Sequence, residues 1–299
     1  MATENKDLTH LRQKIDKIDN SIQDLLNDRA EIVEEVRKVK DDHGSKIKIR
    51  PAREAEILYR LMKRQKGRFP KQEMTRIWRE IICATIKFEG EFKLAVYYSD
   101  AETGFWDLAR DQYGSYTPAT RFSSSRRIVE AVKNGEATLG ILPVPFHDES
   151  ENWWRLIVSS QPDTPKIAGR LPFIDAGITR NKGLQAIVIC SVEHEPTEQA
   201  QSFIAIESSE DIGFATINKC ILDADLSPGF QQSCYDPERP PGWTYLVQLN
   251  QFLDQKGPKN DQLVNNLNRY SLRLNHIGGY AMPLTEINLN TASTSTEDN

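Results

Sequence analysis

The sequence predicts a multidomain protein of the α plus α/β class, because its 299 residues change pattern twice. Residues 1 to about 92 carry apolar side chains at helical spacing, and from Lys93 short apolar runs of strand length alternate with helical segments. From Ser202 the expected elements follow the order β-α-β-β-α-β of a ferredoxin-like domain. The chain should therefore divide into a helical domain at 1–92, a reduced α/β lobe at 93–195, a ferredoxin-like domain at 200–284 and a disordered tail at 285–299.

Three helices are expected in the first part, each marked by its ends. Pro51 and Pro70 suit the first turn of a helix, and Gly44 and Gly67 suit positions just beyond a helix end. The helices should run over residues 7–40, 51–66 and 70–88. Helices of such unequal length cannot close a core alone, so the overhanging first helix favours an intertwined dimer.

Strands and helices alternate in the remaining parts. The α/β lobe should contain strands at 94–98 and 138–142 and helices at 105–113 and 128–134, with a loop-rich middle. The ferredoxin-like part should contain strands at 203–207, 230–235, 244–252 and 272–278 and helices at 214–223 and 261–270.

A heptad seam runs along the first helix, and one of its positions is an arginine. The ten positions follow alternating steps of three and four, as in helices that face a partner helix: Leu8, Leu11, Ile15, Ile18, Ile22, Leu25, Arg29, Ile32, Val36 and Val39. An unpaired charge buried in such a seam is costly, so Arg29 should meet an anion. That anion could be an internal carboxylate, with Arg29 fixing the register of the seam, or it could be a ligand.

Two further cations favour a ligand. Lys40 lies eleven residues beyond Arg29, about 16 Å along the axis and on nearly the same face, so the two side chains could hold one small dianion. Arg12 is about 42 Å of helix away from Lys40 and cannot reach the same ligand from one chain. In an antiparallel twofold dimer, however, Arg12 of one chain approaches the Arg29 to Lys40 region of the other. The spacing therefore permits two composite sites per dimer.

Composition excludes several classes of function. With 38% hydrophobic and 27% charged residues the chain can bury real cores, and a net charge of -5 gives no general reason to expect nucleic acid. No apolar run approaches the roughly 18 residues of a membrane span, and no signal peptide precedes the first helix, so we expect a cytoplasmic protein away from membranes. The 4 cysteines and 5 histidines show no metal-ligand spacing, so neither a metal nor another cofactor is expected.

The charged residues of the first part occur in an order that resembles a known family. Residues 11–19, 25–29, 36–40 and 50–54 closely resemble the all-helical chorismate mutase family, and the resemblance covers residues 8 to about 92. It implies seven site residues, namely Arg12, Arg29, Lys40, Arg53, Glu54, Thr85 and Glu89. By the same resemblance Arg12 would come from the neighbouring subunit, Arg29 and Lys40 would bind the substrate carboxylates, and Glu54 would accept a hydrogen bond from the substrate hydroxyl. Without the resemblance, Arg53 and Glu54 have the pattern of a solvated surface.

The chemistry of that family suits these residue types. The conversion of chorismate to prephenate is an intramolecular pericyclic rearrangement, which needs a dianion held in its folded conformer and donors at the ether oxygen, where negative charge grows. Arg29, Lys40 and Glu89 would act on the reaction itself, and Lys40 could serve both a carboxylate and the ether oxygen. Some family members carry Gln at the position of Glu89, and an ionised Glu89 would repel the developing charge. We therefore expect Glu89 to act while protonated, with a pKa raised by burial and by the bound dianion.

The α/β lobe resembles part of a second family. Residues 94–98, 103–105 and 129–143 look like the first lobe of prephenate dehydratase, which implies a periplasmic-binding-like arrangement. Beyond Pro143 the family continues with Ile-Glu-Asn-Ser, whereas this chain reads Val144-Pro-Phe-His-Asp148. Its Thr-Arg-Phe motif has a counterpart only in residues 179–181. The lobe is also too short for two lobes and a cleft, so we expect a remnant without dehydratase activity.

The last part resembles the ACT regulatory domain. The resemblance covers about residues 202–283 and includes the closing segment His276-Ile-Gly-Gly-Tyr280. ACT domains pair side by side and often bind amino acids, so an amino-acid effector such as phenylalanine is one expectation and a dimerisation module without ligand is the other. The first loop reads Glu210-Asp-Ile-Gly213-Phe, and the family's Glu-Ser-Arg-Pro loop has no clear counterpart near Gln232-Ser-Cys-Tyr235.

Three functions follow from these patterns. The first is a cytoplasmic, homodimeric chorismate mutase that supplies phenylalanine and tyrosine biosynthesis, with a degenerate dehydratase lobe and an ACT-like domain. The second is a bifunctional chorismate mutase and prephenate dehydratase. The third is an amino-acid sensor or scaffold dimer without catalysis, against which a cation in the helical seam argues, because a scaffold gains nothing from it.

Overall fold

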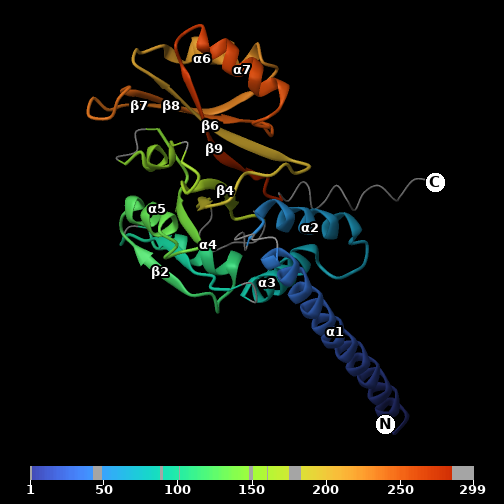
Figure 1. Ribbon diagram of the computed structural model, residues 1–299. Coiled ribbons are helices and arrows are strands. Elements are labelled where there is room, and N and C mark those ends of the chain that lie inside the picture. Colours follow the sequence, from blue (N-terminus) through green and yellow to red (C-terminus); the bar gives the residue numbers. More distant parts are fainter. Residues whose placement is uncertain are drawn as a thin grey trace, which may run out of the picture. The chain divides into compact units, whose positions relative to one another are not determined.

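The computed structural model describes residues 2–42, 49–87, 90–100, 102–147, 151–159, 161–174 and 183–284, with side chains of the first range described for residues 7–39 (Figure 1). The chain forms two compact units. We call Met1–Lys48 with Ala84–Gly90 the helix unit, and Ile49–Cys83 with Glu91–Asn299 the sheet unit. The expected tail at 285–299 lies outside the described residues.

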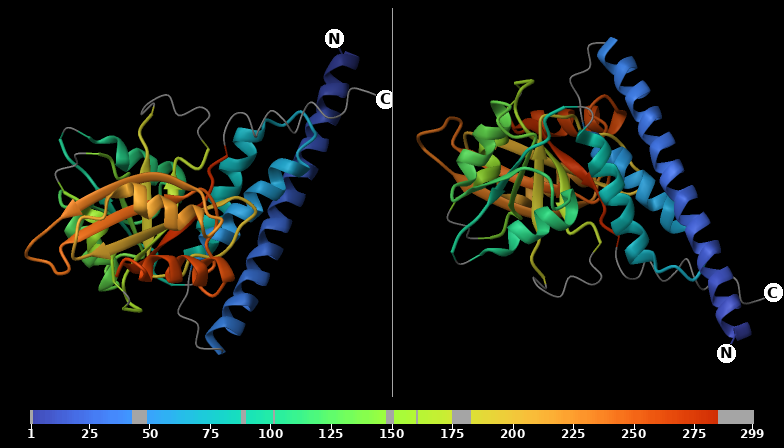
Figure 2. Two further views of the ribbon diagram at one scale, coloured as in Figure 1. Left: turned by 90° about the horizontal axis from the view of Figure 1, so that it is seen from above. Right: turned by 90° about the horizontal axis from the view of Figure 1, so that it is seen from below.

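The helix unit is built on one long helix. Helix α1 spans Ala2–Asp42 and runs without a break, as the views in Figure 2 show. The nine aliphatic positions of the seam are 46% to 66% exposed, and Arg29 is half-buried. An exposed apolar stripe of this length is unusual for a folded chain. The first helix expected from the sequence is confirmed, with its start five residues earlier than predicted.

Helix α2, Pro51–Arg64, is an integral part of the sheet unit. Proline at its first turn needs no hydrogen-bond partner for the missing N–H, and one face of the helix is apolar. Ala55, Leu58, Tyr59 and Met62 are buried there in a cluster with side chains of residues 173, 281 and 284. The last turn is also attached by charge, because Lys63 Nζ lies 2.5 Å from a carboxylate oxygen of Glu198.

Helix α3, Lys71–Ile86, passes from the sheet unit into the helix unit, since the boundary falls between Cys83 and Ala84. Its buried positions are Thr75, Arg79, the adjacent pair Ile82 and Cys83, and Ile86, which all lie on one face of the helix. An arginine therefore lies on the buried stripe of this helix too. The second and third helices expected from the sequence are confirmed, and each ends two residues earlier than predicted.

Nine strands form one mixed sheet in the order β2-β1-β3-β5-β4-β9-β6-β8-β7. The strands are β1 Leu94–Tyr97, β2 Ala119–Phe122, β3 Leu139–Pro143, β4 Lys166–Leu171, β5 Ala186–Cys190, β6 Ala200–Ser208, β7 Pro228–Tyr235, β8 Trp243–Leu249 and β9 Arg273–Ala281. Strands β2, β1 and β3 are parallel, with α4, Gly104–Tyr113, and α5, Ser125–Lys133, between them in the chain. All remaining pairs are antiparallel except β4 with β9.

A glycine allows the two halves of the sheet to join. Gly278 of β9 pairs with Ile167 of β4 and has a φ of +109°, a conformation that side chains other than glycine rarely adopt. A Cβ atom at Gly278 would lie 2.2 Å from the backbone oxygen of Ile167. The close approach of β9 to β4 therefore requires a glycine at position 278.

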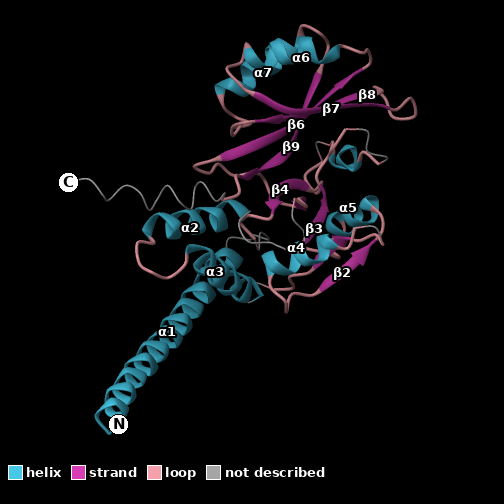
Figure 3. Cartoon of the chain, turned by 180° about the vertical axis from the view of Figure 1, so that it is seen from behind, coloured by secondary structure: helices cyan, strands magenta, loops and turns pink. Residues whose placement is uncertain are grey.

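The ferredoxin-like order β-α-β-β-α-β is confirmed in strands β6 to β9. Helices α6, Gly213–Leu222, and α7, Pro258–Asn268, lie together on one face of these strands (Figure 3). Their apolar side chains share a core with the facing side of the strands, which includes Ile204, Ile206 and Val247. The sheet does not end at β9, so the ferredoxin-like part and the α/β lobe are continuous through β4.

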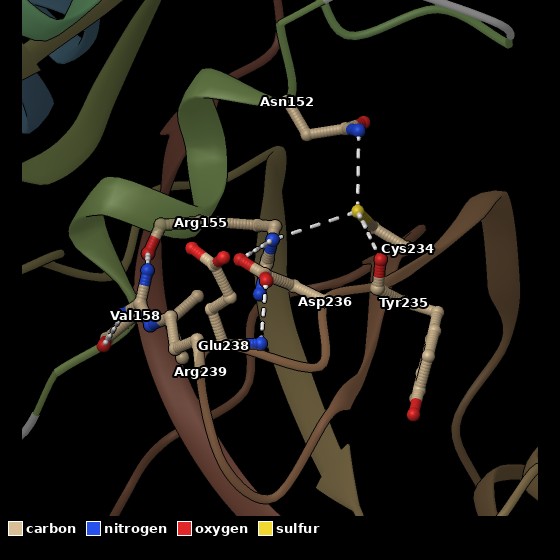
Figure 4. Close-up of polar contacts among 8 residues, drawn as sticks. All are labelled: Asn152, Arg155, Val158, Cys234, Tyr235, Asp236, Glu238 and Arg239. Carbon is tan, nitrogen blue, oxygen red and sulfur yellow. Dashed lines mark hydrogen bonds and ion pairs between the residues drawn. The ribbon is translucent and has the colours of Figure 1, made fainter.

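A polar cluster fixes the loop-rich middle of the lobe to the ferredoxin-like part. The short 3-10 helix η2, Trp153–Ile157, carries Arg155, whose Nη1 lies 2.9 Å from Oδ2 of Asp236 (Figure 4). Arg239 donates hydrogen bonds to the backbone oxygens of Arg155 and Val158, at 2.8 and 3.2 Å. These contacts connect η2 to the end of β7 and to the turn that follows β7.

No helix in the described part of the chain is long and apolar enough to cross a membrane. Within the same residues, no group of three or more His, Cys, Asp or Glu side chains is placed to hold a metal ion. Cys83, Cys190, Cys220 and Cys234 are free thiols, and the first three are buried.

Candidate active site

Two of the expected site residues meet in the helix unit. Nη1 of Arg29, from the middle of α1, donates a hydrogen bond of 3.2 Å to Oγ1 of Thr85, at the end of α3. The two residues are 56 positions apart in the chain, so this contact is made by folding and not by sequence proximity. Burial lowers the pKa of Arg29 from its usual value, which is the cost of moving a cation away from water.

The remaining expected residues of the helix unit are placed less fully. Arg12 is exposed on α1, seventeen residues before Arg29 and therefore about 25 Å from it along the helix. Lys40 belongs to α1, but its side chain lies outside the described residues, as does all of Glu89. One chain thus brings together Arg29 and Thr85 and holds Arg12 far from them.

Arg53 and Glu54 belong to the sheet unit and face different surroundings. Arg53 is exposed, and its Nη1 lies 3.3 Å from Oε2 of Glu56, one turn further along α2. Glu54 is half-buried and lines a pocket of the sheet unit. Burial, and after it the negative charge of Glu54, raise the pKa of Tyr113, whereas at Arg79 burial lowers the pKa and the charge of Glu54 opposes that effect.

The pocket lined by Glu54 has a cavity volume of about 40 Å³ and opens to solvent on one side. Two arginines, Arg79 of α3 and Arg170 of β4, share its wall with Gln112 and Tyr113. Its remaining lining residues are Ile49, Pro51, Ala55, Leu139, Ala168, Gly169, Leu171, Phe173 and Ala281. The pocket therefore combines cationic groups with a largely apolar wall.

Arg79 is a residue that the sequence analysis missed. It is buried, at 9% exposure, and its guanidinium carbon lies 4.8 Å from the centre of the Phe173 ring. Burial lowers the pKa of Arg79, and the charge of Glu54 acts in the opposite direction. A signal was present, because Arg79 stands four residues after Thr75 and three before Ile82 on the buried stripe of α3.

The loops expected to bind an effector are tightly structured. Gly213 has a φ of +69° at the start of α6, and the hydroxyl of Tyr245 accepts a hydrogen bond from the backbone N–H of Ile212 and donates one to Asp211, both at 2.9 Å. Residues 232–235 form the end of β7, where side chains of Gln232 and Cys234 contact Asn152. The counterpart of the Thr-Arg-Phe motif at 179–181 lies outside the described residues.

Comparison with known proteins identifies the first part of the chain. Residues 11–90 match the family described as chorismate mutase type II. The bifunctional chorismate mutase/prephenate dehydratase of Aquifex aeolicus (strain VF5) is 31% identical over 170 residues, which are 56% of this chain and 46% of that protein. The protein of the same name from Stutzerimonas stutzeri is 30% identical over 141 residues, 46% of this chain and 38% of its own length.

The match therefore covers less than half the length of either relative. Among solved structures, the X-ray structure of prephenate dehydratase from Streptococcus mutans has a TM-score of 0.48 at 11% sequence identity and covers 64% of this chain and 98% of that chain. The resemblance expected from the sequence is confirmed: residues 11–90 match the chorismate mutase type II family, and the chain is similar to bifunctional mutase/dehydratase proteins.

Proposed function

We propose that this chain is a chorismate mutase, which rearranges chorismate to prephenate in the biosynthesis of phenylalanine and tyrosine. The observation that carries the proposal is the hydrogen bond between Arg29 and Thr85, two residues of the expected site that the fold brings together within a domain of the mutase family. A half-buried arginine beside a hydroxyl provides several donors directed at one place, which suits the carboxylate of a small dianion.

The rearrangement requires that the substrate be held in position and that positive charge lie near its carboxylates and ether oxygen. Arg29 and Lys40 would hold the two carboxylates and so keep the substrate in its folded, reactive conformer. Lys40 would also donate to the ether oxygen as that bond breaks and negative charge develops there. Glu89, in its protonated form, would donate to the same oxygen, while Thr85 would orient Arg29 through their hydrogen bond.

A second copy of the chain would complete the site. The exposed seam of α1 needs a partner of the same apolar spacing, and the helix of a second copy offers one. In a twofold dimer the partner subunit's Arg12 would reach the ligand held by Arg29 and Lys40. Arg53 and Glu54 would join the site from α2, with Glu54 accepting a hydrogen bond from the substrate hydroxyl.

The sheet unit would serve other purposes than mutase chemistry. We infer that residues 93–195 are a reduced lobe of the dehydratase type without its activity, and that residues 200–284 are an ACT-like domain that pairs with its copy. This domain would either bind an amino-acid effector or serve as a dimerisation module without ligand. The ferredoxin-like strand order β9-β6-β8-β7 supports the second inference. We place the protein in the cytoplasm, where its substrate and product are small and soluble.

A bifunctional mutase and dehydratase is the second candidate. The match to the Aquifex aeolicus protein extends over 170 residues, and only 80 residues of the chain lie within the mutase family match. A dehydratase would need a proton donor placed at the leaving hydroxyl of prephenate, between two lobes.

One experiment separates the candidates. Purified protein is mixed with chorismate, its loss is followed by ultraviolet absorbance, and the products are analysed at neutral pH. We expect chorismate to disappear while prephenate accumulates. Phenylpyruvate among the products would favour the bifunctional enzyme instead, and the absence of any chorismate loss at every pH tested would leave a sensor or scaffold.

A further inference from the structure

The pocket around Arg79 belongs wholly to the sheet unit and has no role in the proposed rearrangement, apart from its shared residue Glu54. Helices α2 and α3 contribute Glu54 and Arg79, strand β4 contributes Arg170, and α4 contributes Gln112 and Tyr113. A cavity of 40 Å³ holds about three water molecules, or the polar head of a small ligand whose remainder lies in the open mouth.

Arg79 is the strongest sign that this pocket binds an anion. Its guanidinium carries five N–H donors, and the residue is more than nine-tenths buried. No hydrogen bond from Arg79 to another residue is found within the described part of the chain, where its contacts are the face of Phe173 and the charge of Glu54. Because Arg79 lines the pocket wall, a ligand in the pocket could accept hydrogen bonds from its guanidinium, and such charge-assisted bonds are stronger in a mostly buried site than at the open surface.

The charges on the pocket wall specify the charge of the ligand. Arg79 and Arg170 contribute two positive charges, and Glu54 contributes one negative charge. Arg170 forms hydrogen bonds with neutral groups: its Nη2 donates to Oε1 of Gln185 at 2.7 Å, and its guanidinium is also hydrogen-bonded to the hydroxyl of Tyr280. With its side chains in their ordinary ionic forms, the wall therefore has a net charge of about +1. One monoanion would neutralise this charge, whereas a dianion would leave a net negative charge in the pocket.

The rest of the wall specifies the body of the ligand. Apolar side chains from α2, β3, β4 and β9 line the pocket, together with the ring of Phe173 beneath the Arg79 guanidinium. A carboxylate on a small apolar or aromatic body matches this combination, because its head would take the open donors and its body would cover the wall. An ammonium group would be repelled by the two arginines, and it could bind Glu54 only if that carboxylate turned away from Arg79.

We propose that this pocket is a binding site for a small monocarboxylate with an apolar body, held through its carboxylate by Arg79 with Arg170 nearby. The site is separate from the heptad seam and from Arg29. Since Glu54 is shared, a carboxylate bound at Arg79 would repel Glu54 and change its position; this consequence for catalysis rests on the proposed mutase function, whereas binding itself does not.

Binding of three matched probes tests the proposal on the full chain by isothermal titration calorimetry. The probes are 3-phenylpropionate, L-phenylalanine and 2-phenylethylamine, which share a phenyl ring and differ in charge. We expect 3-phenylpropionate to bind tightest. The Arg79→Gln variant should weaken that binding by about tenfold or more, the loss of one charge-assisted contact. Arg76→Gln is the matched control, because Arg76 is exposed on the same helix one turn earlier.

Two further measurements keep the test decisive. Circular dichroism establishes that Arg79→Gln is folded, and Arg170→Gln, at a half-buried position, provides a second variant with an expected weakening of about threefold. The proposal is overturned if 3-phenylpropionate does not bind, if both arginine variants bind it like the parent chain, or if L-phenylalanine binds more tightly in a manner that depends on Arg79. None of these measurements uses chorismate, so failure of the mutase proposal would leave them intact.

Discussion

The helix unit and the sheet unit place their apolar side chains in opposite ways. In the helix unit, nine aliphatic side chains of α1 stand 46% to 66% exposed along one stripe. In the sheet unit, side chains such as Leu58, Ile204 and Leu246 are fully buried within a single chain. Because burial of apolar surface stabilises folding, the sheet unit has its own core, whereas the helix unit requires another surface to cover the stripe.

Each unit also carries one arginine on an apolar stripe. Arg29 interrupts the seam of α1 and donates to Thr85, while Arg79 interrupts the buried stripe of α3 and lies over the ring of Phe173. The same residue type at the same spacing is therefore used twice, once at a surface that we assign to a substrate and once in a pocket that we assign to a monocarboxylate. We take a cation on an apolar stripe as a sign of a ligand in either setting.

Removing the seam arginine should have the largest effect. We expect Arg29→Ala to lower the mutase rate by a factor of about 10² to 10³, because a charged donor that positions the dianion is lost. Chorismate turnover measures the loss, and sedimentation velocity should show an unchanged assembly. Arg64→Ala, at an exposed position in the last turn of α2, is the control. Robust turnover by Arg29→Ala would contradict the site.

Substitutions in the two apolar surfaces should separate folding from assembly. Leu58→Ala removes a fully buried side chain of α2 and should lower the free energy of unfolding by about 2 to 5 kcal/mol in a denaturant titration. Ile18→Asp places a charge in the seam, where the native side chain is 59% exposed, and should dissociate the proposed dimer with little effect on the sheet unit.

Lys17→Asp is the control for the seam, since Lys17 is exposed on the neighbouring position of α1. Sedimentation velocity measures the assembly of both variants. A dimer that survives Ile18→Asp would show that another surface holds the two chains together and would remove the basis for a composite site with Arg12 of the partner subunit.

Regular elements with a clear period could be predicted from the sequence. The three helices of the first part and all six elements of the ferredoxin-like part were expected and are present. Three strands of the lobe were missed: β5 was overlooked although its five residues form a buried apolar run, whereas β2 and β4 carry little pattern of their own. Strand β2 is at an edge of the sheet with two exposed residues, and β4 contains an irregularity at Gly169 and pairs with β9 more than a hundred residues later. Such pairings depend on distant segments, which local periodicity does not report.

The candidate site divides in the same way. Arg29 could be predicted because it occupies a heptad position among nine aliphatic residues of the seam. Thr85, to which it donates a hydrogen bond, was expected in the same site from the family resemblance. Arg79 was missed because Glu80 follows it and α3 carries exposed charged residues on its other faces, so that a further arginine reads as surface. The pocket that Arg79 lines is completed by residues of β4 and α4, which are distant from α3 in the sequence and come together with it only in the folded chain.

A pH profile should sharpen the assignment of the proposed catalytic site. Because Glu89 is expected to donate a hydrogen bond while protonated, mutase activity should fall as pH rises through its pKa. Glu89→Gln keeps a neutral donor, so its activity should stay flat over the same range. Rates of chorismate loss measured from pH 5 to 9 for both proteins test this, and an identical profile in the variant would remove the role of Glu89.

The smallest expected effect concerns the stability of the sheet unit. Burial lowers the pKa of His194 to about 4 and that of His276 to about 4, below their usual 6.5. The folded chain therefore binds fewer protons than the unfolded chain between these values, so the free energy of unfolding falls as pH decreases from 6.5 toward 4. At pH 5 the loss should be about 1 to 2 kcal/mol for each histidine. Urea titrations of His194→Asn should show a shallower fall than the parent chain, and His10→Asn, at an exposed position of α1, should show the parent's fall. If His194→Asn matched the parent at every pH, protonation of His194 would have no part in the acid sensitivity of the sheet unit.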